Sequence, residues 1–120
     1  MNATIKEAWV KALRSGEYVQ KGWRLRSGEK EFDAEGVLVD LFVKAKKLKW
    51  VEPNEEEPGY ILVIKDRVYR TETPSAVLKW AERSKEDYFA VGTTHYTIAG
   101  LGDLAGLSFE QIAAIIEAKM

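Results

Sequence analysis

Cysteine is absent from this chain of 120 residues, and histidine occurs once, as His95. The absence of cysteine excludes disulfides, zinc sites with cysteine ligands and thiol catalysis. No run of apolar residues reaches the ~18 that a membrane-spanning helix needs, and the first residues lead into an amphipathic helix instead of a signal peptide. We therefore predict a cytoplasmic protein with no cofactor, no metal site and no membrane association.

Asparagine and glutamine are also scarce, with two of each in the chain. Depletion of these thermolabile side chains, together with abundant lysine and glutamate, is typical of thermophilic proteins and predicts a thermophilic source. The formal net charge of −1 provides no general attraction to nucleic acid. A content of 46% apolar and 31% charged residues is that of a folded globular protein. The length fits one domain that covers residues 1–120.

The N-terminal part of the chain predicts two helices joined by a polar connector. Thr4 and Glu7 have the spacing of a capping box at the start of the first helix. Extended segments are expected in the connector at residues 18–20 and 23–25. Asp33 can cap the second helix, which is apolar nearly all round and is therefore expected at the centre of the core. The apolar stripes comprise Ile5, Ala8, Trp9, Ala12 and Leu13 in the first helix and Ala34, Val37, Leu38, Leu41, Ala45 and Leu48 in the second.

The rest of the chain predicts two hairpins and two further helices. Runs rich in β-branched and aromatic residues favour hairpins at residues 60–70 and 88–98. Thr73 precedes a proline and can cap the third helix, while Ser108 and Gln111 have the spacing of a capping box for the last one. Together these elements predict an α+β fold, a single compact domain with about four helices packed on a small, mostly antiparallel sheet.

Blocks of residues spread over most of the chain match one recurrent pattern. A tryptophan helix ends in Ala-Leu-Arg-Ser-Gly, and a Tyr-x-Gln step and a largely apolar helix follow it. The matching positions are Trp9, residues 12–16, Tyr18, Gln20, Leu25, Arg26, residues 32–41, Pro74, Val77, Trp80, Ala81, residues 101–103, Ser108, Phe109, Ile112, Ala113, Ile116 and Glu117. This pattern resembles a family of small proteins encoded by tailed phages, which has no assigned biochemical activity. The resemblance implies a viral setting, in the cytoplasm of an infected host cell.

The chain departs from that family at four positions of the second helix and its start. Relatives carry cysteines where this chain has Asp33, Ala34 and Val39, so this member cannot need a thiolate metal site or a redox role. The family cysteines are then best interpreted as small buried apolar residues. Glu35 replaces a leucine in the first turn, where a carboxylate suits the helix dipole. We expect Glu35 to be exposed.

Isolated features that could carry catalysis have simpler interpretations. His95 lies in a predicted strand with no nucleophile motif near it, which favours a half-exposed strand residue. The acidic pairs Glu56 with Glu57 and Glu86 with Asp87 lie in polar loops, where burial would not tune a pKa for acid–base work. We therefore predict no catalytic residue and no enzymatic activity.

Two other segments invite a nucleic-acid interpretation. Residues 107–113 resemble the second helix of a helix-turn-helix motif, but no recognition helix follows them and core packing explains them better. Lys44, Lys46, Lys47 and Lys49 precede Trp50 and could contact phosphates and stack on bases. The alternative is a set of cations at a helix C-terminus, and the acidic run that follows favours it. We predict no specific reading of DNA.

The connector between the first two helices is the best candidate for a polar site. Its arginines could clamp an anion bidentately, and its tyrosine could stack or donate a hydrogen bond. The alternative is that Arg14 pairs with Asp40 and that Gln20 satisfies backbone groups of a turn. The candidate set for ligand or partner binding is Arg14, Tyr18, Gln20, Arg24, Arg26, Asp40 and Asp103.

The leading hypothesis is a small phage-encoded binding protein that inhibits or redirects a host protein by stoichiometric occlusion of its surface. It depends on the phage resemblance and on the lack of a recognisable catalytic motif. An alternative from another class is sequestration of a small anionic metabolite or nucleotide by the connector arginines. Hydrolysis at an unrecognised acidic site is a third hypothesis.

Overall fold

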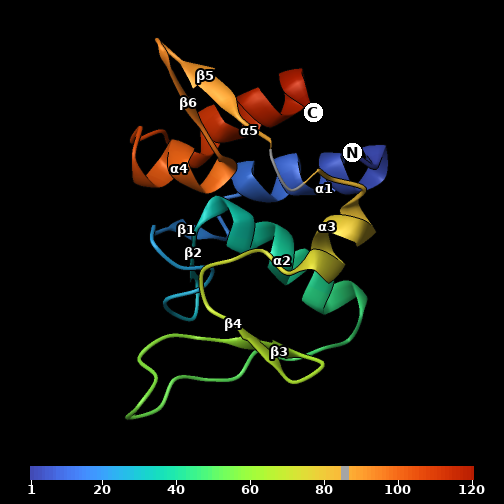
Figure 1. The fold of residues 1–120 in the computed structure, drawn as a ribbon, viewed down its shortest axis with the longest axis vertical. Helices are drawn as coiled ribbons and strands as arrows, with labels where there is room; N and C mark the ends of the chain where they lie inside the picture. Colours follow the sequence, from blue (N-terminus) through green and yellow to red (C-terminus); the bar gives the residue numbers. More distant parts are fainter. Residues whose placement is uncertain (85–86) are drawn as a thin grey trace.

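The computed structural model describes residues 1–84 and 87–120, and these form a largely helical core with short strand pairs around it (Figure 1). Within this part of the chain there are five helices and six strands. The helices are α1 (Ala3–Arg14), α2 (Ala34–Ala45), α3 (Ser75–Ala81), α4 (Ile98–Asp103) and α5 (Phe109–Lys119). The strands are β1 (Val19–Gln20), β2 (Glu31–Phe32), β3 (Leu62–Ile64), β4 (Arg67–Tyr69), β5 (Phe89–Val91) and β6 (Thr94–Tyr96).

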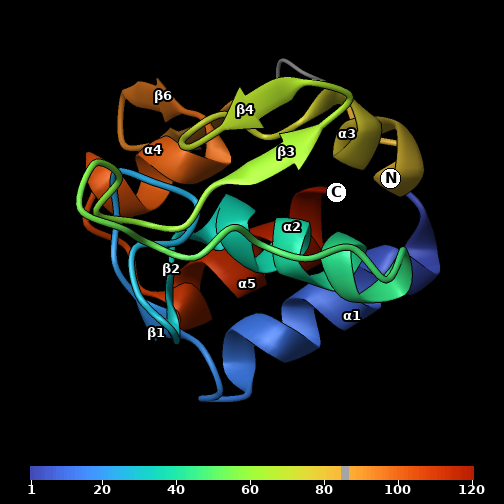
Figure 2. The same cartoon turned by 90° about the horizontal axis from the view of Figure 1, so that it is seen from below.

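Helix α2 lies at the centre of the core, as its apolar composition predicted. It packs against α1, α3 and α4, while α1 also packs along α5 (Figures 1 and 2). Val37, Leu38 and Val39 are completely buried on successive positions of α2. Neighbouring helices cover most of this element, while Lys44 and Ala45 near its C-terminus are exposed. None of the helices in the described ranges is long and apolar enough to span a membrane.

The predicted α+β class is confirmed, but the strands of the described residues are divided among three separate pairs. β1 and β2 pair in parallel, whereas β3 with β4 and β5 with β6 form antiparallel hairpins. The β3–β4 turn consists of Lys65 and Asp66, both with positive φ angles of 48° and 67°, as a tight two-residue hairpin requires. Such short pairs cannot support a core alone, so the helices form most of it.

Several predicted element boundaries were wrong because the caps differ from those expected. Asn2, and not Thr4, caps α1 by accepting a hydrogen bond from the Ile5 backbone N–H. Pro74 occupies the N-cap position of α3 and makes no side-chain capping bond, which leaves Thr73 outside that role. The capping box of α5 between Ser108 and Gln111 is confirmed.

Other corrections concern the ends of α2, the connector and the second hairpin. Helix α2 ends at Ala45, so Leu48 does not extend its apolar stripe and is 40% exposed. Residues 23–25 form no strand, since Trp23 has a φ of +73°. The predicted hairpin strand ends at Tyr96, because Thr97 accepts a hydrogen bond from the Gly100 N–H and starts the unpredicted helix α4.

The expectation that Glu35 would be exposed was wrong. Its side chain lies in the core beside Arg83, which donates to both carboxylate oxygens at 2.5 and 3.0 Å. The Arg83 side chain is only 4% exposed, and its guanidinium also lies 4.9 Å from the Trp9 ring centroid. Arg83, which compensates the charge of the buried Glu35, belongs to a distant segment of the chain. The sequence pattern of α2 therefore gives no sign of this partner.

Candidate functional site

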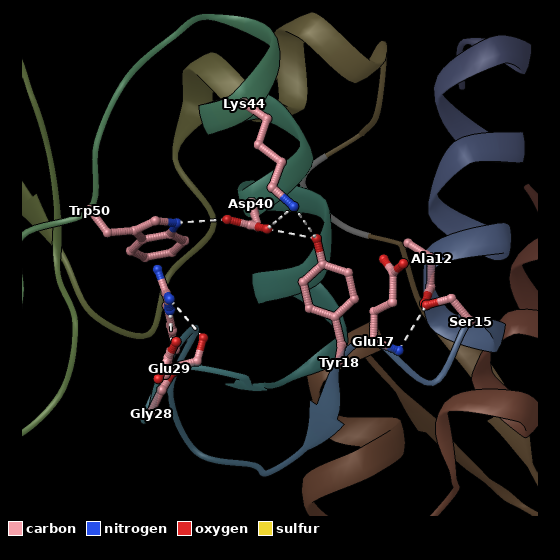
Figure 3. Close-up of polar contacts among 10 residues, drawn as sticks. Ala12, Ser15, Glu17, Tyr18, Gly28, Glu29, Asp40, Lys44 and Trp50 are labelled. Carbon is pink, nitrogen blue, oxygen red and sulfur yellow. Dashed lines mark hydrogen bonds and ion pairs between the residues drawn. The ribbon is translucent and has the colours of Figure 1, made fainter.

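Asp40 on α2 is the centre of a polar network that includes connector residue Tyr18 (Figure 3). The Tyr18 hydroxyl donates to Asp40 Oδ2 at 2.6 Å, and the Trp50 indole N–H donates to Oδ1 at 3.0 Å. Lys44 Nζ lies 3.1 Å from Oδ2. Asp40 is buried, and its neighbours account for both carboxylate oxygens. The network therefore ties the connector and the segment after α2 to the core.

This environment also changes the acidity of Tyr18. Burial of the phenol raises its pKa to about 12, and the hydrogen bond to the Asp40 carboxylate adds to the shift. A tyrosine with so high a pKa remains a neutral hydrogen-bond donor at every physiological pH. Tyr18 therefore positions Asp40 and does not present an ionisable group to a ligand.

The three candidate arginines do not converge on one site. Arg14 lies against α5 and pairs with Glu110 and Glu117 at 3.1 Å each, so the predicted alternative of a pair with Asp40 was wrong. Arg24 donates to the Tyr60 carbonyl at 3.1 Å and lies 3.4 Å from a Glu57 carboxylate oxygen.

Arg26 is held by its own turn and by aromatic rings. It donates to the carbonyls of Gly28 and Glu29 at 3.2 and 2.7 Å. Its guanidinium carbon also lies 3.8 Å from the Tyr60 ring centroid, a cation–π distance. Arg24 and Arg26 therefore hold the loop that contains Tyr60, while Arg14 fastens α1 to α5.

Gln20 and Asp103 lie together at a different place, near the start of α5. Gln20 donates to the Leu107 carbonyl at 2.8 Å and accepts from the Phe109 backbone N–H at 2.9 Å. The expectation that Gln20 satisfies turn backbone is confirmed. Asp103 Oδ1 accepts a hydrogen bond from the Trp23 backbone N–H at 3.1 Å.

The turn before Trp23 fits Asp103 closely. Trp23 has a left-handed φ of +73°, which is uncommon for a bulky residue. A Cβ atom at Gly22 would lie 2.0 Å from Asp103 Oδ1, so only glycine leaves room for the carboxylate. Gly22 and Asp103 thus fix the backbone of Trp23, whose side chain is nevertheless 67% exposed. Leu104, which follows Asp103, is 68% exposed.

A cavity of about 420 Å³ adjoins this turn and contains a second carboxylate. Asp33 caps α2 by accepting from the Gly36 N–H at 2.6 Å, and it is buried beside the cavity. No lysine, arginine or histidine is among the described residues that line it. The lining consists of Gln20, Gly22, Asp33, Ala34, Ile98, Ala99, Gly102, Asp103, Gly106, Leu107, Ser108 and Gln111. We refer to this space as the Asp33–Asp103 cavity.

Both carboxyls of the cavity have raised pKa values. Burial raises the pKa of Asp33 to about 8 against the opposing hydrogen bond from Gly36, and the charges of Glu35 and Asp103 add to the shift. Burial also raises the pKa of Asp103, while the Trp23 N–H opposes that change. Asp33 therefore holds its proton at neutral pH, and no cation among the described lining residues stabilises its charged form.

Sequence reasoning found Gln20 and Asp103 but missed the roles of Asp33 and Trp23. Asp33 was identified only as a helix cap, and its distance from Asp103 in the sequence concealed their proximity. The one local signal at Trp23 was a large aromatic residue directly after glycine within a polar connector.

Other regions offer weaker candidates. His95 is exposed on β6 and lines a cavity of about 800 Å³ with Asp87, Lys119 and several apolar residues. Glu86 lies outside the described residues. Lys44 is paired with Asp40, and the Trp50 N–H is bound to the same carboxylate. Across residues 1–84 and 87–120, no group of three or more histidine or acidic side chains is placed to hold a metal ion.

Comparisons with known proteins identify a family and do not assign an activity. No curated protein and no solved structure matches this chain significantly. One family model, described as a domain of unknown function (DUF8296), matches residues 1–120. A match over the entire length shows that the chain belongs to the DUF8296 family.

Proposed function

We propose that this protein acts by binding another protein, as a phage-encoded factor that inhibits or redirects a host protein by covering part of its surface. The observation that carries the proposal is Trp23, whose indole is 67% exposed while its backbone is held by Asp103. Tryptophan is among the residues most enriched at the energetic centres of protein interfaces. A side chain on a fixed backbone loses less conformational entropy on binding, which increases affinity.

The surroundings of Trp23 support a protein partner more than a small ligand. Leu104 adds a second exposed apolar side chain directly after the aspartate that binds Trp23. An exposed apolar patch rimmed by polar groups is typical of protein interaction sites. The resemblance to small tailed-phage proteins supports the viral setting and a host protein as the partner.

The two alternative functions have less support. Sequestration of an anion would need free arginines, whereas Arg14, Arg24 and Arg26 are bound to separate carboxylates, carbonyls and rings. One observation favours hydrolysis. Asp33 and Asp103 both have raised pKa values and lie close together, as the two carboxyls of an acid–base pair do. Asp33 is, however, nearly fully buried and engaged in capping α2.

Affinity capture with matched variants tests the proposal. The wild-type protein, Trp23→Ala and Tyr88→Ala would be immobilised and exposed to bacterial lysates, and retained proteins would be identified. Tyr88 is a suitable control because it is also an exposed aromatic residue, at 58%, away from this turn. We expect a stoichiometric partner that the wild type and Tyr88→Ala retain and that Trp23→Ala binds about 30-fold more weakly, as for an interface hot spot. Equal retention by folded Trp23→Ala would contradict the proposal.

A further inference from the structure

Residues 22–24 form a short bend between two fixed points of the connector. The backbone N–H groups of Lys21 and Leu25, on either side of the bend, donate to carbonyls of other segments at 2.9 Å each. Between them, the Trp23 N–H donates to Asp103 Oδ1 at 3.1 Å. Within the described part of the chain, this is the one hydrogen bond that the backbone of the bend makes. The course of the bend therefore depends on a single polar contact.

Trp23 needs that contact because its backbone conformation is unfavourable by itself. Its φ of +73° is left-handed, where the Cβ of a bulky residue crowds the backbone. Such conformations persist only where the surrounding contacts enforce them. Gly22 makes the contact possible, since a Cβ there would lie 2.0 Å from Asp103 Oδ1. The mostly exposed indole forms no hydrogen bond with a described residue, so it cannot replace the bond to Asp103.

The strength of this bond depends on the charge of Asp103. An ionised carboxylate accepts a stronger hydrogen bond than a neutral carboxyl does. Partial burial raises the pKa of Asp103, against the opposing bond from the Trp23 N–H. The carboxyl therefore takes up a proton at a higher pH than an exposed aspartate would. Protonation removes the cost of burying the charge but weakens the bond that holds Trp23.

The groups around Asp103 do not keep it ionised. Helix α4 packs against α2, α5 and β6. At the start of α2, Asp33 has a pKa of about 8 and is uncharged below neutral pH. In the Asp33–Asp103 cavity α5 contributes an uncharged glutamine, while His95 of β6 lines a different cavity. In the connector, Lys21 and Arg24 lie 3.7 and 3.4 Å from glutamates of other segments.

We propose that Asp103 is a charge-dependent restraint on Trp23, which holds the bend in its binding conformation when ionised and releases it when protonated. The inference rests on the proposed function and adds a means of regulation to the same site. A released Trp23 has more conformational freedom to lose on binding. The partner protein therefore binds more weakly at acidic pH.

A pH titration followed by nuclear magnetic resonance tests the restraint without a partner. The isotope-labelled wild type would be titrated from about pH 7.5 to about pH 4.5, with the Trp23 amide and the Asp103 carboxyl carbon observed together. We expect the amide proton to move upfield with the same midpoint as the carboxyl carbon, because its hydrogen bond weakens. Relative to its intrinsic exchange rate, that amide should also lose about tenfold of its protection.

Two matched variants assign the titration to Asp103. In Asp103→Asn the amide oxygen can still accept from the Trp23 N–H, while the negative charge is lost. At neutral pH its Trp23 amide should resemble that of the acidified wild type, and it should not titrate. Glu7→Gln removes an exposed charge from α1, outside the cavity lining, and should titrate as the wild type does. Near-ultraviolet circular dichroism would verify the fold of both variants, and the wild-type titration decides the outcome if Asp103→Asn does not fold.

The outcomes separate this inference from the function on which it rests. A Trp23 amide that does not follow the Asp103 carboxyl, or that titrates equally in Asp103→Asn, would overturn the inference. Neither result bears on protein binding, which the lysate capture at neutral pH decides. For a captured partner, the advantage of the wild type over Asp103→Asn should be about fivefold at pH 7.5 and absent at pH 4.5. An equal advantage at both pH values would also overturn the inference and leave the protein-binding function intact.

Discussion

At the scale of single residues, Asp33 both caps a helix and lines a cavity. Its carboxylate accepts the Gly36 N–H at the start of α2, a favourable position for an anion beside the helix N-terminus. Burial and the neighbouring acids act in the opposite direction and raise its pKa to about 8. The residue is therefore a source of pH dependence in the folded protein.

We expect the stability of the wild type to fall as pH rises from about 4 to about 8. An unfolded aspartate has a pKa near ~3.9, so in this window the native state holds a proton that the unfolded state has lost. Stability then decreases with pH by at most about 1.4 kcal/mol per unit for one proton. The raised pKa of Asp103 contributes in the same direction.

Urea unfolding of the wild type and Asp33→Asn between pH 5 and pH 8.5 would measure this effect. Asparagine can still cap the helix, so the variant should fold and show a shallower pH dependence. Identical pH profiles for the two proteins would show that Asp33 does not titrate in this range.

At the scale of secondary-structure elements, Trp9 joins three segments through one side chain. The residue is completely buried on α1. Its indole N–H donates to the Ala34 carbonyl in the first turn of α2 at 2.9 Å, and its ring lies beside Arg83. The docking of α1 on the core therefore depends on one large side chain with a specific polar contact.

Trp9→Ala should lower the free energy of unfolding by roughly 3–5 kcal/mol, because it leaves a large cavity between α1 and α2. Trp9→Phe keeps most of the apolar volume but cannot donate to Ala34, so its loss should be smaller. Chemical denaturation of both variants gives the comparison. A loss below about 1 kcal/mol for Trp9→Ala would contradict the role of this contact in docking α1.

Local patterns predicted some elements well and others poorly. The positions of α1, α2, α5 and both hairpins followed from apolar periodicity, β-rich runs and turn residues, which act within a few residues. Helix α4 was missed because it is six residues long and contains Gly100 and Gly102, which disfavour helix in isolation. Its packing against α2 and α5 stabilises it instead. The need for glycine at position 36 was also not predictable, because it comes from a contact with another segment of the chain. A Cβ atom at Gly36 would lie 1.8 Å from the Leu25 carbonyl oxygen.

At the scale of the whole molecule, exposed and partly buried ion pairs connect distant parts of the chain. Arg14 links α1 to two glutamates of α5, while Glu57 lies between Arg24 and Arg70. Isolated exposed pairs contribute little at room temperature, but networks gain importance at high temperature because charged groups lose less hydration free energy there. This arrangement agrees with the scarcity of thermolabile side chains.

We expect the purified protein to melt above the range of about 45–65 °C that is usual for mesophilic domains. Differential scanning calorimetry at neutral pH and moderate salt would measure the midpoint. Repeating the scan at 1 M salt should lower the midpoint if the exposed pairs contribute. A midpoint within the mesophilic range would contradict the thermophilic interpretation of the composition.

The sequence by itself determined the α+β class, the central position of α2 and the absence of cysteine chemistry. These properties depend on composition and on short-range periodicity, which each segment carries independently. Only the tertiary structure decided which charged groups meet. It placed Arg83 beside Glu35, separated the three arginines of the connector and brought Asp33 and Asp103 to one cavity next to Trp23. Such pairings follow from how the helices pack, and residues far apart in the chain carry no local signal of their contact.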